Sequence, residues 1–144
     1  MATTITAATL TSTIQESLTL NGQVYGNTNI HEVVSQGQSS SRVLSCATGV
    51  TVLLNLSTTD SAGTIVGDNV KYMRFTNLDD TNFVTLQVHN GASSYYKIKL
   101  GAGESHLFMN NQMGIGTEAL ADMSIVKGQA DTLACDIEVL TITA

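Results

Sequence analysis

Residues 70–110 constrain the fold more than any other part of the chain, because short strand-like segments alternate there with compact turn segments. The segments 84–89 and 95–100 alternate apolar and polar residues with a period of two, which is typical of strands with one buried face. Segment 70–76 carries apolar residues on both faces, which predicts a central strand covered on both sides. We therefore predict an antiparallel meander over residues 70–110.

The rest of the chain also favours β structure. Its 144 residues include no proline, a residue that is kept out of central strands because it cannot donate to the hydrogen-bond ladder. Threonine, valine, isoleucine and leucine are abundant, and no window shows a sustained helical period. We expect an all-β protein, a single antiparallel β-sandwich of jelly-roll-like type over residues 1–144, with eight to ten short strands.

The first third of the chain predicts one regular strand followed by an irregular excursion. Residues 9–20 alternate between polar side chains, mostly threonine, on one face and Leu10, Ile14, Leu18 and Leu20 on the other. Asn21-Gly22 then supplies a turn. Residues 21–41 are rich in Gly, Asn, Ser and Gln, so we expect a long loop with at most one short strand around residues 30–34.

Further strands are predicted on both sides of the meander. Residues 42–46 and 50–56 are interpreted as a hairpin whose inner face carries Val50, Val52, Leu54 and Leu56. Residues 123–126 form one short strand. Residues 133–139 alternate in a last long strand.

Composition excludes several classes of protein. The formal charge is −6 and the six basic residues are scattered along the chain, which argues against nucleic-acid binding. No apolar stretch approaches the length of a membrane-spanning helix, and the N-terminus lacks the pattern of a cleaved secretion signal. We expect Cys46 and Cys135 to be buried small hydrophobic residues in a reducing compartment, not a bridge, a redox pair or metal ligands.

The sequence offers no catalytic or cofactor-binding residue, so we expect a protein that is not an enzyme. His31, His89 and His106 are isolated, and a cupin-type enzyme would require two histidines and a carboxylate close together. The glycine-rich segments 101–103 and 114–116 are interpreted as turns.

Two ligand sites remain open at this stage. Asp79, Asp80 and Asn82 form a weak calcium candidate, although Asx side chains that close a turn explain the same residues better. The same loop with His89, Tyr95 and Tyr96 suggests a sugar platform, which the low aromatic content of 5% weakens.

The segment VKYMRFTNLDDTNFVTLQV, followed by a tyrosine-containing strand, the turn LGAGESHLFM and the ending DIEVLTITA, resembles small virion proteins of tailed phages. The resemblance covers residues 70–144. It implies a β-sandwich structural protein of the capsid cement or decoration type, made in the host cytoplasm, that assembles as a homotrimer on the outer capsid. Its partners would be further copies of the chain and the major capsid protein.

An N-terminal arm at about residues 1–13 suits this role, because an exposed strand can add to the sheet edge of a neighbour. An ordinary first strand of the same sheet is the equal alternative. Inter-subunit contacts are expected from apolar residues of two segments: Leu10, Ile14, Leu18, Leu107, Phe108 and Met109. A tail or fibre module that binds host surface glycan is the alternative function. Removal of residues 1–13 should leave a folded protein that has lost assembly.

Overall fold

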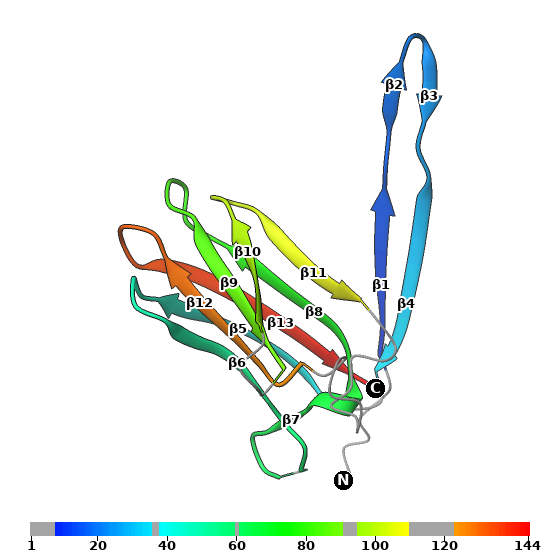
Figure 1. The fold of residues 1–144 in the computed structure, drawn as a ribbon. Coiled ribbons are helices and arrows are strands. Elements are labelled where there is room, and N and C mark those ends of the chain that lie inside the picture. Colours follow the sequence, from blue (N-terminus) through cyan, green and yellow to red (C-terminus); the bar gives the residue numbers. More distant parts are fainter. Residues whose placement is uncertain (1–7, 36–37, 60, 91–94, 110–122) are drawn as a thin grey trace, which may run out of the picture.

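The computed structural model describes residues 8–35, 38–59, 61–90, 95–109 and 123–144. Most of them form a β-sandwich, beside which a long hairpin stands (Figure 1). One sheet has four strands in the order β11-β8-β13-β5, with bounds β5 (Ser39–Cys46), β8 (Val70–Asn77), β11 (Ser105–Met109) and β13 (Cys135–Thr143). The other has five in the order β10-β9-β12-β6-β7, with bounds β6 (Thr51–Ser57), β7 (Ile65–Val66), β9 (Val84–His89), β10 (Tyr95–Leu100) and β12 (Ile125–Ala130).

All strand pairings of the sandwich are antiparallel except that of β6 with β7. A 3-10 turn (Gly67–Asn69) precedes β8. The predicted all-β class and antiparallel sandwich are therefore confirmed. The chain changes sheet after each sandwich strand except between β6 and β7 and between β9 and β10, which are neighbours in the five-stranded sheet. The finer jelly-roll assignment stays a prediction.

The core lies between the sheets and is made of aliphatic residues with Phe75 and the two cysteines. Phe75 of β8 is fully buried and meets Phe108 of β11 edge to face, with ring centroids 6.2 Å apart. A Cβ at Gly128 of β12 would lie 2.8 Å from the Sγ of Cys46 in the opposite sheet and 2.8 Å from a methyl of Leu53 in its own sheet. Both side chains therefore pack close to the Gly128 backbone, which a larger residue would prevent.

The predicted meander over residues 70–110 is wrong in its pairing. β8 pairs with β11 and β13, whereas β9 pairs with β10 and β12 of the other sheet. The loop after β8 thus crosses the sandwich, and the loop after β10 crosses back. The predicted hairpin of residues 42–46 and 50–56 is wrong for the same reason, since β5 pairs with β13 and β6 with β12. A short turn signal does not tell whether the next strand pairs with the last one or crosses to the opposite sheet.

A β-bulge in β6 changes which side chains face the core. The register opposite β12 moves from Leu54 with Val126 to Val52 with Lys127, so Leu53 is an extra residue on β6. Leu53 and Leu54 are both buried, and Val52 is 51% exposed. The predicted inner face of Val50, Val52, Leu54 and Leu56 is therefore wrong in its first half, where Val50 is also exposed.

The N-terminal segment folds into a hairpin, which we call the arm (residues 8–35). Its base pairs β1 (Ala8–Gln15) with β4 (Thr28–Ser35), and its tip pairs β2 (Leu18–Leu20) with β3 (Gln23–Tyr25). The single strand predicted over residues 9–20 is thus interrupted after β1. The long loop predicted for residues 21–41 is wrong, because it contains β3, all of β4 and the start of β5. Its polar composition reflects strands with little buried surface.

The turn at the tip of the arm follows the prediction. Asn21 and Gly22 have φ angles of 51° and 79°, which are the left-handed values that a two-residue hairpin turn requires. The last strand prediction needs a shift in bounds, since β13 begins at Cys135 and Leu133 is 67% exposed outside it. The predicted strand of residues 123–126 corresponds to β12, which begins at Ile125 and continues to Ala130.

Candidate interaction surfaces

The base of the arm packs on the outer face of the four-stranded sheet. Val33 of β4 is 4% exposed and shares a buried cluster with Tyr72 of β8 and Ile142 of β13. Leu10, the cross-strand partner of Val33, and Met109 pack against this cluster. The contact explains why β8 is apolar on both faces, as its sequence predicts. It also fixes where the arm leaves the sandwich.

Beyond this base the arm stands free of the sandwich, and β2 and β3 lie at its far end (Figure 1). Seven large apolar side chains of the arm are 41–73% exposed: Ile14, Leu18, Leu20, Val24, Tyr25, Ile30 and Val34. The register pairs Leu18 with Tyr25, so Leu18, Leu20 and Tyr25 share one face of the tip. We call these three residues the tip patch. A two-stranded hairpin is marginally stable alone in water, and exposed apolar patches are typical of interaction sites.

A kink separates the base of the arm from its tip. The backbone N–H of Glu16 donates to the carbonyl of Asn27 at 2.8 Å, between the β1–β4 and β2–β3 ladders. A Cβ at Gly26 would lie only 2.0 Å from the carbonyl oxygen of Glu16. Only glycine fits where the backbones of Glu16 and Gly26 approach each other. Because the tip lies beyond this point on both strands, the orientation of the tip patch depends on Gly26.

The predicted interface residues divide into two groups. Ile14 and Leu18 on the arm and Leu107 on β11 have exposed side chains, at 41%, 59% and 38%. Leu10 and Met109 pack in the cluster at the arm's base, and Phe108 packs in the main core. Sequence reasoning missed the larger part of the exposed set, on β3 and β4. The signal was present, since Asn21-Gly22 is flanked by Leu18-Thr19-Leu20 and Val24-Tyr25.

The loop that carries the calcium candidate is a hydrogen-bonded junction. Asn77 is fully buried, and its Nδ2 donates to the carbonyls of Asn82 at 2.8 Å, Gly101 at 3.0 Å and Leu100 at 3.3 Å. These bonds join the loop after β8 to the loop after β10. The hydroxyl of Thr132 donates to Asn82 Oδ1 at 2.7 Å, and this bond connects the loop before β13 to the same junction.

Asp79 closes the turn within this junction. Its Oδ1 accepts from the backbone N–H groups of Asn82 at 2.6 Å and Thr81 at 2.8 Å. These two bonds, that of Asn82 first, hold the pKa of Asp79 below its usual value. The Asp80 carboxylate accepts from the Thr81 hydroxyl at 2.9 Å. Within the described residues no group of three or more His, Cys, Asp or Glu side chains could hold a metal ion. The calcium prediction has no further observation behind it.

The outer face of the five-stranded sheet gathers three of the six basic residues. Lys97 and Lys99 lie on the edge strand β10, and the register places Lys97 and Lys127 on either side of Gln87 of β9. Tyr95 stacks on His89 at 4.6 Å between centroids, and the Lys97 ammonium lies 5.5 Å from the Tyr95 ring. Three of the six basic residues thus lie on one face beside aromatic side chains. Tyr95 is 50% exposed on this face, whereas Tyr96, which is equally exposed, lies on the other face of β10.

The three histidines lie on separate elements. His31 is in the arm, His89 is on the lysine-bearing face, and His106 of β11 packs edge to face on Phe108 at 4.7 Å. Burial lowers the pKa of His106, and burial followed by the charge of Lys127 lowers that of His89. They form no cluster with a carboxylate among the residues described. Whether the chain is an enzyme stays a prediction.

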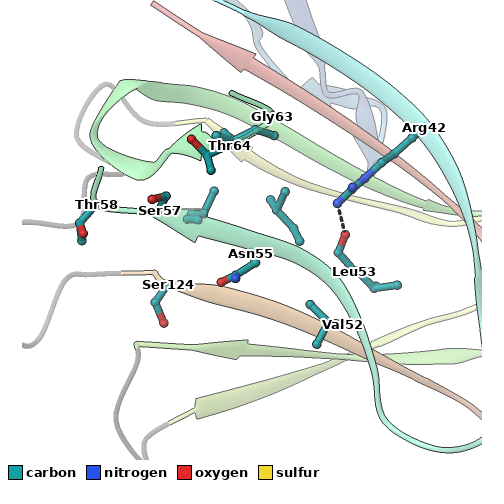
Figure 2. A pocket seen from close by; sticks show the side chains of 12 residues that line it. Arg42, Val52, Leu53, Asn55, Ser57, Thr58, Gly63, Thr64 and Ser124 are labelled. Atoms are coloured by element: carbon teal, nitrogen blue, oxygen red, sulfur yellow. Dashed lines mark hydrogen bonds between the residues drawn. The ribbon is translucent and has the colours of Figure 1, made fainter. Parts of the chain in front are cut away.

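A cavity of about 650 Å³ lies beside β6 and is also lined by residues 63–65 and by Arg42 of β5 (Figure 2). Its lining is mostly aliphatic and hydroxyl-bearing, and Arg42 is its charged residue. The Arg42 guanidinium donates to the carbonyl of Leu53 at 2.6 Å, so this cation is engaged by the backbone at the bulge (Figure 2). The described lining holds no pair of acid and base groups that would serve catalysis.

Cys46 and Cys135 are free thiols, 0% and 1% exposed. The prediction of buried residues is confirmed. The structure adds that they are cross-strand partners, because the last residue of β5 stands opposite the first residue of β13. The glycine turn at residues 101–103 lies after β10, with Gly103 at a φ of 69°. The turn predicted at residues 114–116 lies outside the described residues.

Comparisons with known proteins assign the chain to no family. No protein-family model matches it, and no curated protein matches it. Among solved structures it is similar to a chain from Bacillus endospore appendages, a family of disulfide-linked pili, with a TM-score of 0.47 and 12% identity over 74% of this chain and 85% of that chain. A similarity of this level carries no conclusion about function. No helix among the described residues is long and apolar enough to span a membrane.

Proposed function

We propose that the chain is a phage virion structural protein, a capsid cement or decoration protein that binds the outer capsid as a homotrimer. The observation that carries this proposal is the arm, which exposes seven large apolar side chains away from the sandwich. Monomeric soluble proteins rarely expose an apolar surface of this extent unless it is an interaction site. The resemblance of residues 70–144 to small virion proteins of tailed phages supports the same reading.

The construction of the arm suits a connector between subunits. Its base is held by buried apolar packing around Val33, while the three side chains of its tip patch are exposed. Residues 8–35 contain no Lys or Arg and carry Glu16 and Glu32, so charge favours a partner surface without carboxylates. Under this proposal the partners are further copies of the chain and the major capsid protein. The protein is made in the host cytoplasm and then resides on the capsid surface.

The native mass, measured by light scattering behind a sizing column over a range of concentrations, is the first test of the trimer. A stable mass of three chains supports the proposal. Removal of residues 1–13 is a poor test of the arm, because residues 8–13 pair with residues 30–35 and hold Val33 in place. Substitution of the tip patch leaves that pairing intact.

The double variant Leu18→Thr, Leu20→Thr keeps β propensity and removes the apolar contact. We expect at least a tenfold loss of binding to phage heads that lack their decoration protein, with an unchanged melting temperature. The matched control is Val43→Thr, Leu133→Thr, whose side chains are 57% and 67% exposed outside the arm. Equal binding of the tip variant and the wild type would show that the arm is not the connector.

A second candidate function, a tail or fibre module that binds host glycan, is favoured by the Tyr95–His89 stack with Lys97 above it. Aromatic faces beside hydrogen-bonding groups suit sugar rings, and lysines would select acidic glycans. The test is saturable binding of the protein on a glycan array. Binding that Tyr95→Ala abolishes and Tyr25→Ala leaves intact would assign the glycan-binding function to the chain. Absence of saturable binding would remove it.

A further inference from the structure

We infer, in contrast to the expectation from the sequence, that Cys46 and Cys135 form a redox pair, in which an oxidant of the disulfide class converts the two thiols into an intramolecular disulfide that joins β5 to β13. This inference does not depend on the proposed function. It rests on the register of two strands that are 89 positions apart in the sequence (46 and 135), where the cysteines stand directly opposite each other. Both are free and buried.

The backbone geometry of this position permits the bond. Residues directly opposite in an antiparallel pair have Cα atoms about 4.5–5.5 Å apart, and a disulfide spans Cα distances of about 4.4–6.8 Å. Cys46 and Cys135 also share one face of the sheet, since both belong to the core between the sheets. Formation of the bond therefore needs rotation of two side chains and a small approach of their Cβ atoms, with the strand pairing preserved.

The position of the pair explains how a buried thiol meets an oxidant. Cys46 ends β5 and Cys135 begins β13, so both lie at the end of their ladder. The next residues, Ala47 and Ala134, are exposed. Local opening of a strand end requires far less free energy than global unfolding. Burial raises the pKa of both thiols, which makes reaction from the closed state slow.

The reaction with oxidised glutathione balances in two steps. The thiolate of one cysteine attacks the sulfur–sulfur bond of the oxidant, forms a mixed disulfide and releases one glutathione thiolate. The thiolate of the other cysteine then attacks the protein sulfur of that mixed disulfide and releases the second. The protein loses two protons and two electrons, and the oxidant is reduced to two glutathione molecules.

The disulfide would stabilise the edge strand β5. β5 is an edge strand held only by β13 within the four-stranded sheet, and it is the first sandwich strand after the arm. Along the backbone, a force applied to the arm therefore reaches β5 before any other sandwich strand. A link between β5 and β13 would close a loop of 90 residues, counted from 46 to 135, and restrict the unfolded chain accordingly.

The test starts from the full-length protein, reduced and then incubated with oxidised glutathione, with and without mild urea. We expect the intact mass to fall by about 2 Da, two thiols to disappear, and the melting temperature to rise by about 5–15 °C. Cys46→Ala and Cys135→Ala should lose the difference in melting temperature between oxidised and reduced samples. If either variant fails to fold, the intact mass of the oxidised wild type and the change in its melting temperature still test the inference.

Three outcomes would overturn the inference. The first is a wild-type protein that keeps two free thiols in urea concentrations that open the strand end. The second is a stable glutathione adduct on one cysteine. The third is a reducible dimer, which would mean that the thiols pair between chains. A single oxidised species of monomer mass that dithiothreitol returns to the original mass supports it.

Discussion

Val33 of the arm and Tyr72 of β8 lie in one buried apolar cluster, and each is 4% exposed. This contact is the part of the arm that excludes water most fully, so it determines how firmly the hairpin is held. We expect Val33→Ala to destabilise the arm by about 1–2 kcal/mol, because it removes two buried methyl groups. Hydrogen exchange of amides in residues 8–35 should accelerate, while exchange in β8 and β13 stays slow. Val34→Ala is the control, since Val34 is 50% exposed. Equal acceleration in both variants would contradict the packing role of Val33.

Asn77 should be the most sensitive polar position of the sandwich. Its side chain amide serves three carbonyls from two loops, and its Oδ1 accepts from the N–H of Asp79 at 3.1 Å. Asn77→Ala leaves these groups without their partner and should cost about 2–4 kcal/mol of unfolding free energy, measured by urea denaturation. Asn55→Ala is the control, because Asn55 is exposed on β6. A loss below about 1 kcal/mol would show that water replaces the amide.

Gly26 should tolerate no side chain. A Cβ there would lie 2.0 Å from the carbonyl of Glu16, so Gly26→Ala must separate the strands at the kink. We expect changed amide chemical shifts throughout residues 16–27 and reduced capsid binding, with an unchanged melting temperature of the sandwich. Gly49→Ala provides the comparison, because nothing lies within 4 Å of a Cβ at Gly49. Unchanged shifts near Gly26 would disprove the close crossing.

The stability of the fold should decrease as the pH falls below the ordinary histidine pKa of 6.5. Burial lowers the pKa of His106 in the folded state, so between the lowered and the ordinary value the unfolded chain binds more protons. The stabilising contribution is complete above pH 6.5 and is lost as the pH falls through the folded pKa. His106→Gln removes this titration. Its unfolding free energy, from urea melts at pH 7.5 and 5.0, should change less than that of the wild type. An identical change would assign the effect to other groups.

Asp79 should affect the pH dependence of stability in a lower pH range than His106. Its folded pKa lies below the ordinary value of 3.8, so its contribution is complete above 3.8 and is lost as the pH falls through the lowered value. Asp79→Asn keeps an oxygen that can accept from Asn82 and Thr81, whereas Asp79→Ala removes it. We expect the Asn variant to fold, to be less stable than the wild type at pH 7 because the ionised acceptor is lost, and to show a shallower acid limb below pH 4, followed by circular dichroism. An Asn variant whose acid limb is as steep as that of the wild type would assign this limb to other carboxylates.

The fold class and several local features follow from the sequence alone. A chain without proline, rich in β-branched residues and alternating with a period of two, predicts strands because those properties act within each segment. The Asn21-Gly22 turn and the double-sided burial of β8 follow from local composition in the same way. The Asx side chains of residues 77–82 also close a turn, as their chemistry favours.

Strand pairing and the solvent exposure of each sheet face depend on the tertiary structure. The meander and the 42–56 hairpin were predicted wrongly because a short turn serves equally well for a hairpin and for a crossing between sheets. The arm was not predicted as a hairpin because its strands carry little buried surface, and polar composition then suggests a loop. The Cys46–Cys135 pair and the lysine-bearing face arise from registers between strands distant in sequence. Such registers depend on how the whole core packs, which no local pattern records.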